Sequence, residues 1–385
     1  MATPSAPATR ALPDLLARAA DLKGELVRFA QGPRYQRRLR GQIAEAADRH
    51  GTLDEGVLIS VIDRFALQYQ HPDGRTVVED FIARHRPPLP DDDRDMLLGW
   101  RDVVEGCFEV HRNDGDSVVL HNLIDDLVYT VHSTVGAAAF HELRRRMLTI
   151  CRIVPLHPSS TAWLVSGHLA VFERSAAQEL AHIAADQVMT RPELLERNPE
   201  LLRRAWDVQA EHRAEFVAGF GSDLVVMPPR EADAALRRHF HRVREKAAPA
   251  TTDGPAVGLP EDLLDADSVA IVFDEVEGLT FYRDFGRIDA LFADPGPAPD
   301  RDALARLREY LGDDSVSPLA IRRLVQRHPH NADTVFRALL RKPGFSWARD
   351  GEALLRRRKK SFFACEPRPG MTVLGERLAE LLRGR

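Results

Sequence analysis

The sequence predicts an α+β fold with a helical N-terminal region, a small five-stranded β-barrel-like unit, a helical middle, and a separate, mostly helical C-terminal α/β unit. Two periodicities and one charge pattern lead to this prediction. Apolar residues recur at helical spacing through the first hundred residues and again from about residue 176, whereas those between alternate with the period of a strand. Beyond a stretch rich in proline and glycine, the balance of charged residues changes abruptly, which indicates a further part of the protein.

Helices are expected in the first hundred residues because helix start signals precede apolar stripes. Thr52 and Glu55 have the spacing of a capping box, and so do Thr76 and Glu79. The three acids Asp91–Asp93 suit a helix N-terminus, where the helix dipole favours negative charge. The region is therefore predicted to hold three helices with marked starts before the strands begin.

Five short strands are expected next. Phe108 and Val110 alternate with polar residues, Asn113–Asp116 is a strong turn, and Val118–Leu120 begins a return strand, so a hairpin is predicted. A partly closed barrel is the expected arrangement, because it hides the edges of a small sheet. The other three strand-like runs are 127–131, 148–154 and 163–172.

Helical periodicity dominates the remaining chain, apart from two strand-like runs at 223–227 and 269–273. Gly221 is the expected C-cap of the helix before it, since glycine readily adopts the left-handed conformation that ends many helices. The expected helices begin at about 176 and cover 198–220, 230–246, 302–310, 318–327, 332–341 and 351–360.

The stretch Ala248–Leu259 holds two prolines and two glycines, is followed directly by Pro260, and is predicted to be a linker. A domain boundary is placed there. The predicted segments are 1–104 (N-terminal helices), 105–175 (barrel-like unit), 176–247 (helices packed with it), 248–266 (linker) and 267–385 (C-terminal acidic and basic, mostly helical domain).

Composition narrows the functional class only broadly. The 385 residues carry a formal net charge of −5 and three cysteines without a C-x-x-C pair, which speaks against a disulfide framework or a zinc ribbon. No apolar run reaches the roughly 18 residues of a membrane span, and the first residues lack an apolar signal core. A cytoplasmic protein without a membrane partner is expected. No cofactor is predicted, because neither a P-loop nor a dinucleotide-binding glycine motif is present.

The charge pattern reverses near the end of the chain. Residues 251–300 hold twelve acids and two bases, whereas 301–385 hold nineteen bases and ten acids. The basic run beside Phe362 and Phe363 is typical of a surface that binds phosphates and stacks bases, but the acidic neighbour offers it an internal partner, which the charge cancellation favours. The candidate nucleic-acid-binding residues are Arg356, Arg357, Arg358, Lys359 and Lys360.

Three carboxylates follow the buried strand-like run and form the candidate metal site: Asp274, Glu275 and Glu277. If the strand continues to Glu277, alternation puts Glu275 and Glu277 on one face, roughly 6.5–7 Å apart, where a divalent cation could sit between them. The simpler interpretation, which the acidic surroundings favour, is that these carboxylates are solvated or paired with the basic C-terminal segment. No catalytic residue is predicted, and whether the protein is an enzyme is left open.

Two stretches carry resemblances. Phe65–Val131, with its His71–Thr76 turn, the helix at Asp93–Trp100 and the hairpin, resembles uncharacterised bacterial proteins, some of which end in a Cys-rich SEC-C zinc motif. That motif is absent from this sequence. The stretch Phe273–Leu311 resembles part of an actinobacterial family without a known activity. Neither resemblance implies a catalytic residue.

Three functional hypotheses result. The first is a cytoplasmic non-enzymatic interaction or scaffold protein, whose barrel and flanking helices form a platform for a protein partner. The second is a nucleic-acid-binding protein that uses the basic C-terminal helix. The third is a metal-dependent hydrolase that uses the carboxylates near 274–277.

Overall fold

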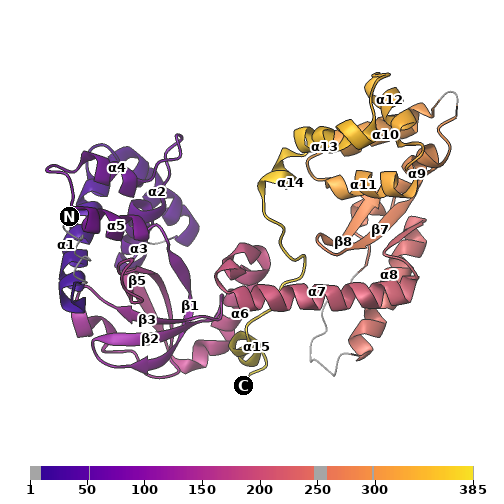
Figure 1. Ribbon diagram of the computed structural model, residues 1–385. Helices are drawn as coiled ribbons and strands as arrows, with labels where there is room; N and C mark the ends of the chain where they lie inside the picture. Colours follow the sequence, from indigo (N-terminus) through magenta and orange to yellow (C-terminus); the bar gives the residue numbers. More distant parts are fainter. Residues whose placement is uncertain (1–9, 52, 247–257, 297–298, 385) are drawn as a thin grey trace, which may run out of the picture. The chain divides into compact units, whose positions relative to one another are not determined.

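The computed structural model describes residues 10–51, 53–246, 258–296 and 299–384 (Figure 1). The fold is α+β, as predicted. Its contacts divide the chain into two compact units, one formed by Met1–Leu201 with Leu374–Arg385 and the other by Leu202–Val373. This division cuts across the five predicted segments. Residues 248–257 of the predicted linker lie outside the described residues, so the boundary expected there stays a prediction.

Two of the N-terminal helices, α3 and α4, begin at a side-chain cap. The cap of α3 is Asp54, whose Oδ1 accepts the Val57 N–H at 2.8 Å; Thr52 lies outside the described residues. The predicted capping box at Thr76 and Glu79 is confirmed by reciprocal bonds of 2.8 and 3.3 Å. The helices of this layer are α1 (Leu12–Gln31), α2 (Gln36–His50), α3 (Glu55–Gln68), α4 (Val77–Arg84) and α5 (Asp91–Gly99).

Five strands close into a barrel in the order β1-β2-β3-β5-β4. Neighbouring strands are antiparallel except β3 and β5, which are parallel. Alternate side chains such as Phe108, Val110, Val118 and Leu120 fill the interior, as the period-two pattern predicts. All five predicted strands are present: β1 (Val104–Asn113), β2 (Ser117–Asn122), β3 (Val128–His132), β4 (Leu148–Pro155) and β5 (Trp163–Phe172).

A buried ionic network joins the N-terminal helices to the barrel. Asp63 of α3 accepts from Arg152 of β4 at 2.9 Å, from Lys23 of α1 at 2.6 Å and from Ser166 of β5 at 2.8 Å. Burial alone would raise the pKa of the Asp63 carboxyl, but Lys23 and Arg152 lower it below its usual value. Because a buried charge needs its partners, this network orients the helical layer on the barrel.

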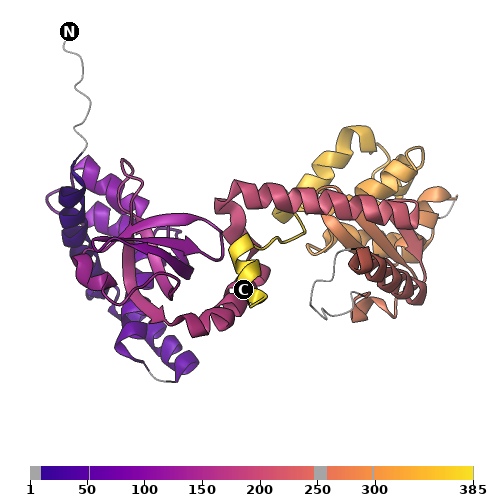
Figure 2. The same cartoon turned by 90° about the horizontal axis from the view of Figure 1, so that it is seen from below.

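Two helices that are distant in sequence pack against each other beside the barrel, and the first of them contacts β1 (Figure 2). They are α6 (Ala177–Thr190), which follows the short turn η2 (Arg174–Ala176), and α15 (Glu376–Leu382). Gly375 precedes α15 and lies against Asp126, because a Cβ built there would be 2.5 Å from the Asp126 Cγ. A residue with a side chain would therefore move α15 or Asp126 away.

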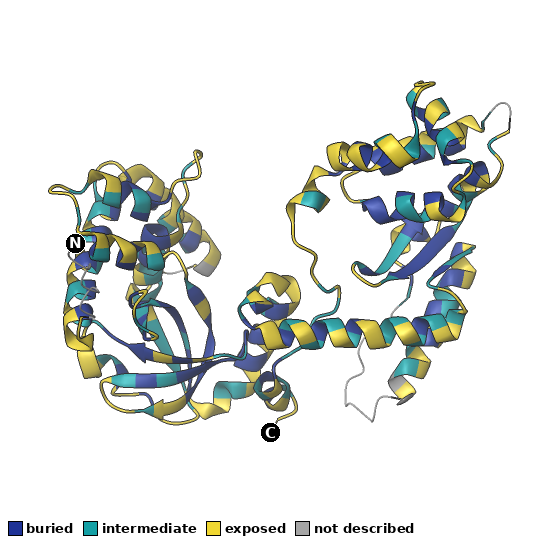
Figure 3. Ribbon diagram, viewed as in Figure 1, coloured by how far each residue is buried: buried dark blue, intermediate teal, exposed yellow. Residues whose placement is uncertain are grey.

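The second unit is a three-stranded sheet between two helical layers, in the order β6 (Leu224–Met227), β7 (Val269–Asp274) and β8 (Gly278–Arg283). Both faces of β7 are buried (Figure 3). Ala270 and Val272 join the cluster of the later helices, whereas Val269, Ile271 and Phe273 join that of Phe216 and Leu236. The helices are α7 (Pro199–Phe220), α8 (Pro229–Lys246), α9 (Phe285–Ala293), α10 (Arg301–Gly312), α11 (Pro318–Arg327), α12 (Ala332–Leu340), α13 (Glu352–Arg358) and α14 (Lys360–Ala364).

Candidate anion-binding pocket

The three predicted metal-binding carboxylates lie in a turn, not along a strand. β7 ends at Asp274, and β8 starts at Gly278, whose φ is +69°. Residues 275–277 form the turn between the two strands. The strand therefore does not continue to Glu277, and the expectation that Glu275 and Glu277 share one strand face is wrong. The carboxylate of Glu275 points into solvent with a side chain 77 % exposed, 3.5 Å from Arg213.

The carboxylate of Asp274 is held by hydrogen bonds from the backbone of the turn and from Arg323. Its Oδ1 accepts the N–H groups of Val276 and Glu277 at 2.9 and 3.2 Å, and its Oδ2 accepts Arg323 at 2.9 Å. Burial would raise the pKa of Asp274, but these donors lower it below its usual value. Burial raises the pKa of Glu277. Asp274 thus serves as a structural anchor of the turn between β7 and β8.

The acidic segment does find basic partners, as the charge reversal suggested, but not in the run 356–360. Asp284 pairs with Arg306 at 2.7 Å, and Asp289 pairs with Arg327 at 3.0 Å. Among the described residues of 251–300, we find no ion pair with the five candidate nucleic-acid-binding bases.

The five bases of the run differ from one another. Lys359 is fully buried, and its Nζ donates to the backbone oxygen of Asp313. Arg356 lies 4.7 Å from the centre of the Phe363 ring and 3.7 Å from Glu352. The exposed members are Arg356, Arg357, Arg358 and Lys360. Lys359 is therefore part of the core of the second unit, and a phosphate surface here has four bases at most.

A second group of bases gathers in the first unit around one pocket of about 360 Å³. Its lining combines the outward side of β1, the loop before β4, the turn η2 and α15. Four guanidinium groups face one carboxylate across this pocket. The lining residues are Glu109, Val110, His111, Arg145, Arg146, Arg174 and Arg377.

Arg377 and Glu109 neutralise each other. Arg377 donates from Nε and Nη2 to the two oxygens of Glu109 at 2.6 and 3.0 Å, although 268 positions separate the residues. The hydrogen bond to Glu109 raises the pKa of Arg377. Such a bidentate pair fixes α15 on the barrel. It also removes the carboxylate as a partner for the other arginines.

The remaining arginines have no acceptor in the part of the chain that the structure describes. Arg145, Arg146 and Arg174 are exposed at the rim, and none forms a side-chain hydrogen bond or ion pair among the described residues. Burial lowers the pKa of His111, and His121, Arg377 and Arg145 lower it further against the opposing effect of Glu109. Both observations indicate a pocket of positive potential, where an anion replaces water favourably.

The backbone holds Arg146 in an unusual conformation. Its φ is +68°, in the left-handed region that a residue with a side chain rarely adopts, at a cost of about 1–3 kcal/mol. Two backbone hydrogen bonds with Val110 of β1 maintain this conformation. The Arg146 N–H donates to the Val110 oxygen at 2.8 Å, and the Val110 N–H donates to the Met147 oxygen at 2.9 Å. The strained turn thereby places consecutive arginines, Arg145 and Arg146, at the same pocket.

A smaller pocket of about 190 Å³ continues from the first and reaches the start of α6. It shares Glu109, Arg146, Arg174 and Arg377 and adds Ser175 and the first residues of α6. A helix N-terminus carries partial positive charge, so it adds to the attraction that the arginines exert on an anion.

Sequence reasoning missed every residue of this pocket. The available signal was the triplet Arg144-Arg145-Arg146 between two predicted strands, because charged residues in a loop between strands meet at the end of a barrel. Arg174 and Arg377 gave no local signal, since both reach the pocket only through the packing of α6 on β1 and of α15 on α6.

The comparisons with known proteins add no family and no fold relative: no family model, no curated protein and no solved structure matches this chain. Within the described residues, no helix is both long enough and apolar enough to span a membrane.

Proposed function

We propose that this chain is an interaction protein whose first unit binds a partner through a phosphate group. The observation on which the proposal rests is the arginine-lined pocket, in which Arg145, Arg146 and Arg174 have no acceptor among the described residues. Guanidinium groups bind phosphate oxygens by paired, charge-assisted hydrogen bonds.

The size of the pocket favours a single phosphate group over a long polyanion. A volume of about 360 Å³ accommodates a phosphate monoester with part of its carrier. The carrier can be a phosphorylated protein side chain or a small phosphate ester, and both present the same dianion to the arginines. The interaction-protein hypothesis derived from the sequence thus gains a candidate surface and a candidate ligand chemistry.

Titration calorimetry of the full chain tests this proposal. The ligands are inorganic phosphate, a phosphoserine peptide and a nucleoside monophosphate, with the unphosphorylated peptide as the blank. We expect one site per chain. Replacing Arg145 and Arg146 together by Gln should lower the affinity at least about tenfold, because each charge-assisted bond contributes about 1.5–3 kcal/mol.

The matched control replaces the exposed pair Arg357 and Arg358 by Gln, which removes the same charge from the second unit. Affinity should then stay within about twofold of that of the unchanged protein. Tighter binding of the phosphoserine peptide identifies a protein partner, and tighter binding of the nucleotide identifies a small ligand. Equal loss in both double variants, or no binding by any of the three phosphates, would contradict the proposal.

The alternative function is nucleic-acid binding by the second unit. The observation that favours it is the surface of α13 and α14, where Arg357, Arg358 and Lys360 are exposed beside Phe362, whose exposed fraction is 37 %. Cations next to an exposed ring are typical of surfaces that bind single strands. Three or four bases give only weak, salt-sensitive affinity, so this function ranks second.

A further inference from the structure

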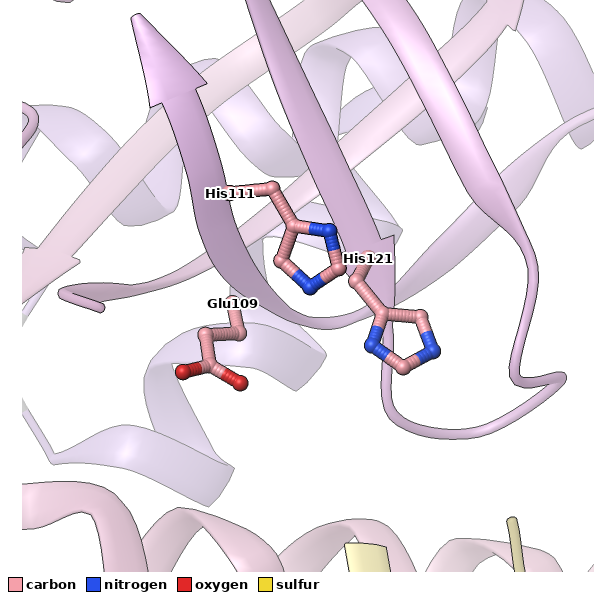
Figure 4. Close-up of side chains that lie close together, drawn as sticks. All are labelled: Glu109, His111 and His121. Atoms are coloured by element: carbon pink, nitrogen blue, oxygen red, sulfur yellow. The ribbon is translucent and has the colours of Figure 1, made fainter. Parts of the chain in front are cut away.

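Three side chains of the types that bind metal ions lie together on the outer face of the barrel (Figure 4): Glu109, His111 and His121. Glu109 and His111 lie two residues apart on β1, and Glu109 pairs directly with His121 of β2. One ligand atom from each side chain lies within 4.8 Å of the others. Among the described residues, this is the one group of three His, Cys, Asp or Glu side chains whose ligand atoms lie this close together.

A β-bulge positions His111. The register between β1 and β2 shifts between Val110 and Arg112, which leaves His111 as the extra residue of the bulged strand. Such a bulge turns a side chain away from the regular pleat. Here the ring centres of His111 and His121 lie 4.9 Å apart (Figure 4).

The two ring nitrogens of His121 have different surroundings. The residue is 9 % exposed, and its Nε2 lies 2.8 Å from the carboxylate of Asp126. Its Nδ1 is buried without any hydrogen-bond partner. Histidine ligands commonly hold a carboxylate with one ring nitrogen and the metal with the other, so Asp126 would orient the ring for an ion at Nδ1. An unsatisfied buried nitrogen otherwise carries a desolvation cost.

We propose that Glu109, His111 and His121 form a binding site for a divalent transition metal, with Zn²⁺ as the best candidate. Two imidazoles and one carboxylate favour zinc and related ions over Mg²⁺ or Ca²⁺, which prefer oxygen ligands. Zinc bonds of about 2.0–2.1 Å require ligand atoms roughly 3.3 Å apart, so the side chains close inward on binding. A free position remains for water or an anion, because the protein supplies three ligands.

Arg377 competes with the metal for Glu109. The two oxygens of Glu109 are both held by this arginine, so an ion must displace at least one of these bonds. Arg377 therefore has opposite effects on the two ligands of this surface. It should weaken the binding of the metal and strengthen that of phosphate, and this difference separates the metal site from the phosphate-binding proposal.

Titration of the metal-free full chain with Zn²⁺, and the visible absorption of Co²⁺ in the same site, test the proposal. We expect one ion per chain and a Co²⁺ spectrum of low coordination number. His111→Asn and His121→Asn should each lower the Zn²⁺ affinity at least about tenfold. The exposed His182 of α6, whose Nδ1 donates to the Gln178 backbone oxygen at 2.7 Å, provides the control variant His182→Gln.

Arg377→Gln gives the sharpest result. It should raise Zn²⁺ affinity several-fold while lowering phosphate affinity. His111 is exposed, so the His111→Asn variant keeps its fold even if the His121 variant does not. Zn²⁺ binding that is unchanged in His111→Asn, that falls equally in His182→Gln, or that weakens in Arg377→Gln would overturn the assignment. Those results would leave the phosphate titrations unaffected, so each proposal can fail by itself.

Discussion

Two basic runs, Arg144–Arg146 and Arg356–Lys360, look alike in sequence and differ in what the fold makes of them. The shorter run lies in a strained loop before β4, and two of its arginines line a pocket without acceptors among the described residues. The longer run lies on α13 and α14, where Lys359 is buried and Arg356 stacks on Phe363. The number of consecutive charges is therefore a poor guide to a binding site.

The difference follows from geometry. Consecutive residues of a helix point in directions about 100° apart, so the three arginines that end α13 are spread around it. Lys359 lies between α13 and α14, and its side chain faces the core. A tight loop at a sheet can instead direct neighbouring side chains to one place. The loop run also gains bases at its pocket from elsewhere in the chain, namely Arg174 and Arg377.

The largest expected effect tests the structural role of the longer run. Replacing Lys359 by Ala removes a buried side chain and leaves the Asp313 oxygen without its donor. We expect the free energy of unfolding of the second unit to fall by about 2–4 kcal/mol. Calorimetric melting of the full chain measures this. Arg358→Ala, one residue away and exposed, is the control and should change stability by less than about 0.5 kcal/mol. Equal effects would show that Lys359 is not a core residue.

The next effect tests how the shorter run gains its distant arginine. Gly375→Ala puts a Cβ 2.5 Å from the Asp126 Cγ, so α15 or Asp126 must move away, and we expect α15 to shift and take Arg377 out of the pocket. We expect phosphate affinity to fall about tenfold, the equivalent of one charge-assisted bond. Gly24→Ala is the control, because nothing lies within 4 Å of a Cβ there. Unchanged phosphate binding in Gly375→Ala would show that the docking of α15 is not needed for the pocket.

Most of the secondary structure was predictable because it depends on local patterns. The alternation around Phe108, the capping box at Thr76 and the acids at Asp91–Asp93 each encode their element within a few residues. The sequence patterns do not predict the strand β8 and the helix α9, and they leave open a strand that continues from Phe273 to Glu277. Gly278 was the signal for a turn, since glycine tolerates its positive φ.

The candidate site was not predictable in the same way. Glu109 and Arg377 are 268 positions apart, and their pairing depends on how α15 packs on the barrel, which no local period encodes. The bulge at His111 likewise arises from the register between two strands. Sequence patterns of one chain indicate faces and ends of elements, but not which distant faces meet.

A third prediction concerns the ion pair between Asp274 and Arg323 in the second unit. The folded pKa of Asp274 is lowered below its ordinary 3.8, so its ion pair with Arg323 stabilises the fold above that value and is lost as pH falls through the folded pKa. Asp274→Asn should cost about 1 kcal/mol near pH 7, since the amide keeps the turn bonds and loses the charge. Denaturant unfolding should show that this difference shrinks as the pH falls below 3.8 and is lost as the pH passes the lowered pKa of the folded state. A difference that grows on acidification would contradict the sign of the pKa shift.

The smallest expected effect decides whether the longer run binds nucleic acid at all. Replacing Arg357, Arg358 and Lys360 by Gln removes three exposed charges and leaves Lys359 in the core. If the pocket of the first unit is the binding surface, affinity for a single-stranded oligonucleotide should be weak and should change less than about twofold. The slope of log affinity against log salt should then stay the same within about one unit. Fluorescence anisotropy between low and moderate salt measures both quantities.

If these bases do contact phosphates, each released counterion contributes about 0.7 to the slope for a single strand, so the slope should become shallower by about two units. A change of that size, together with a loss of more than about tenfold in affinity and an unchanged melting temperature, would make the second unit a nucleic-acid-binding surface and reverse the order of the two proposed functions.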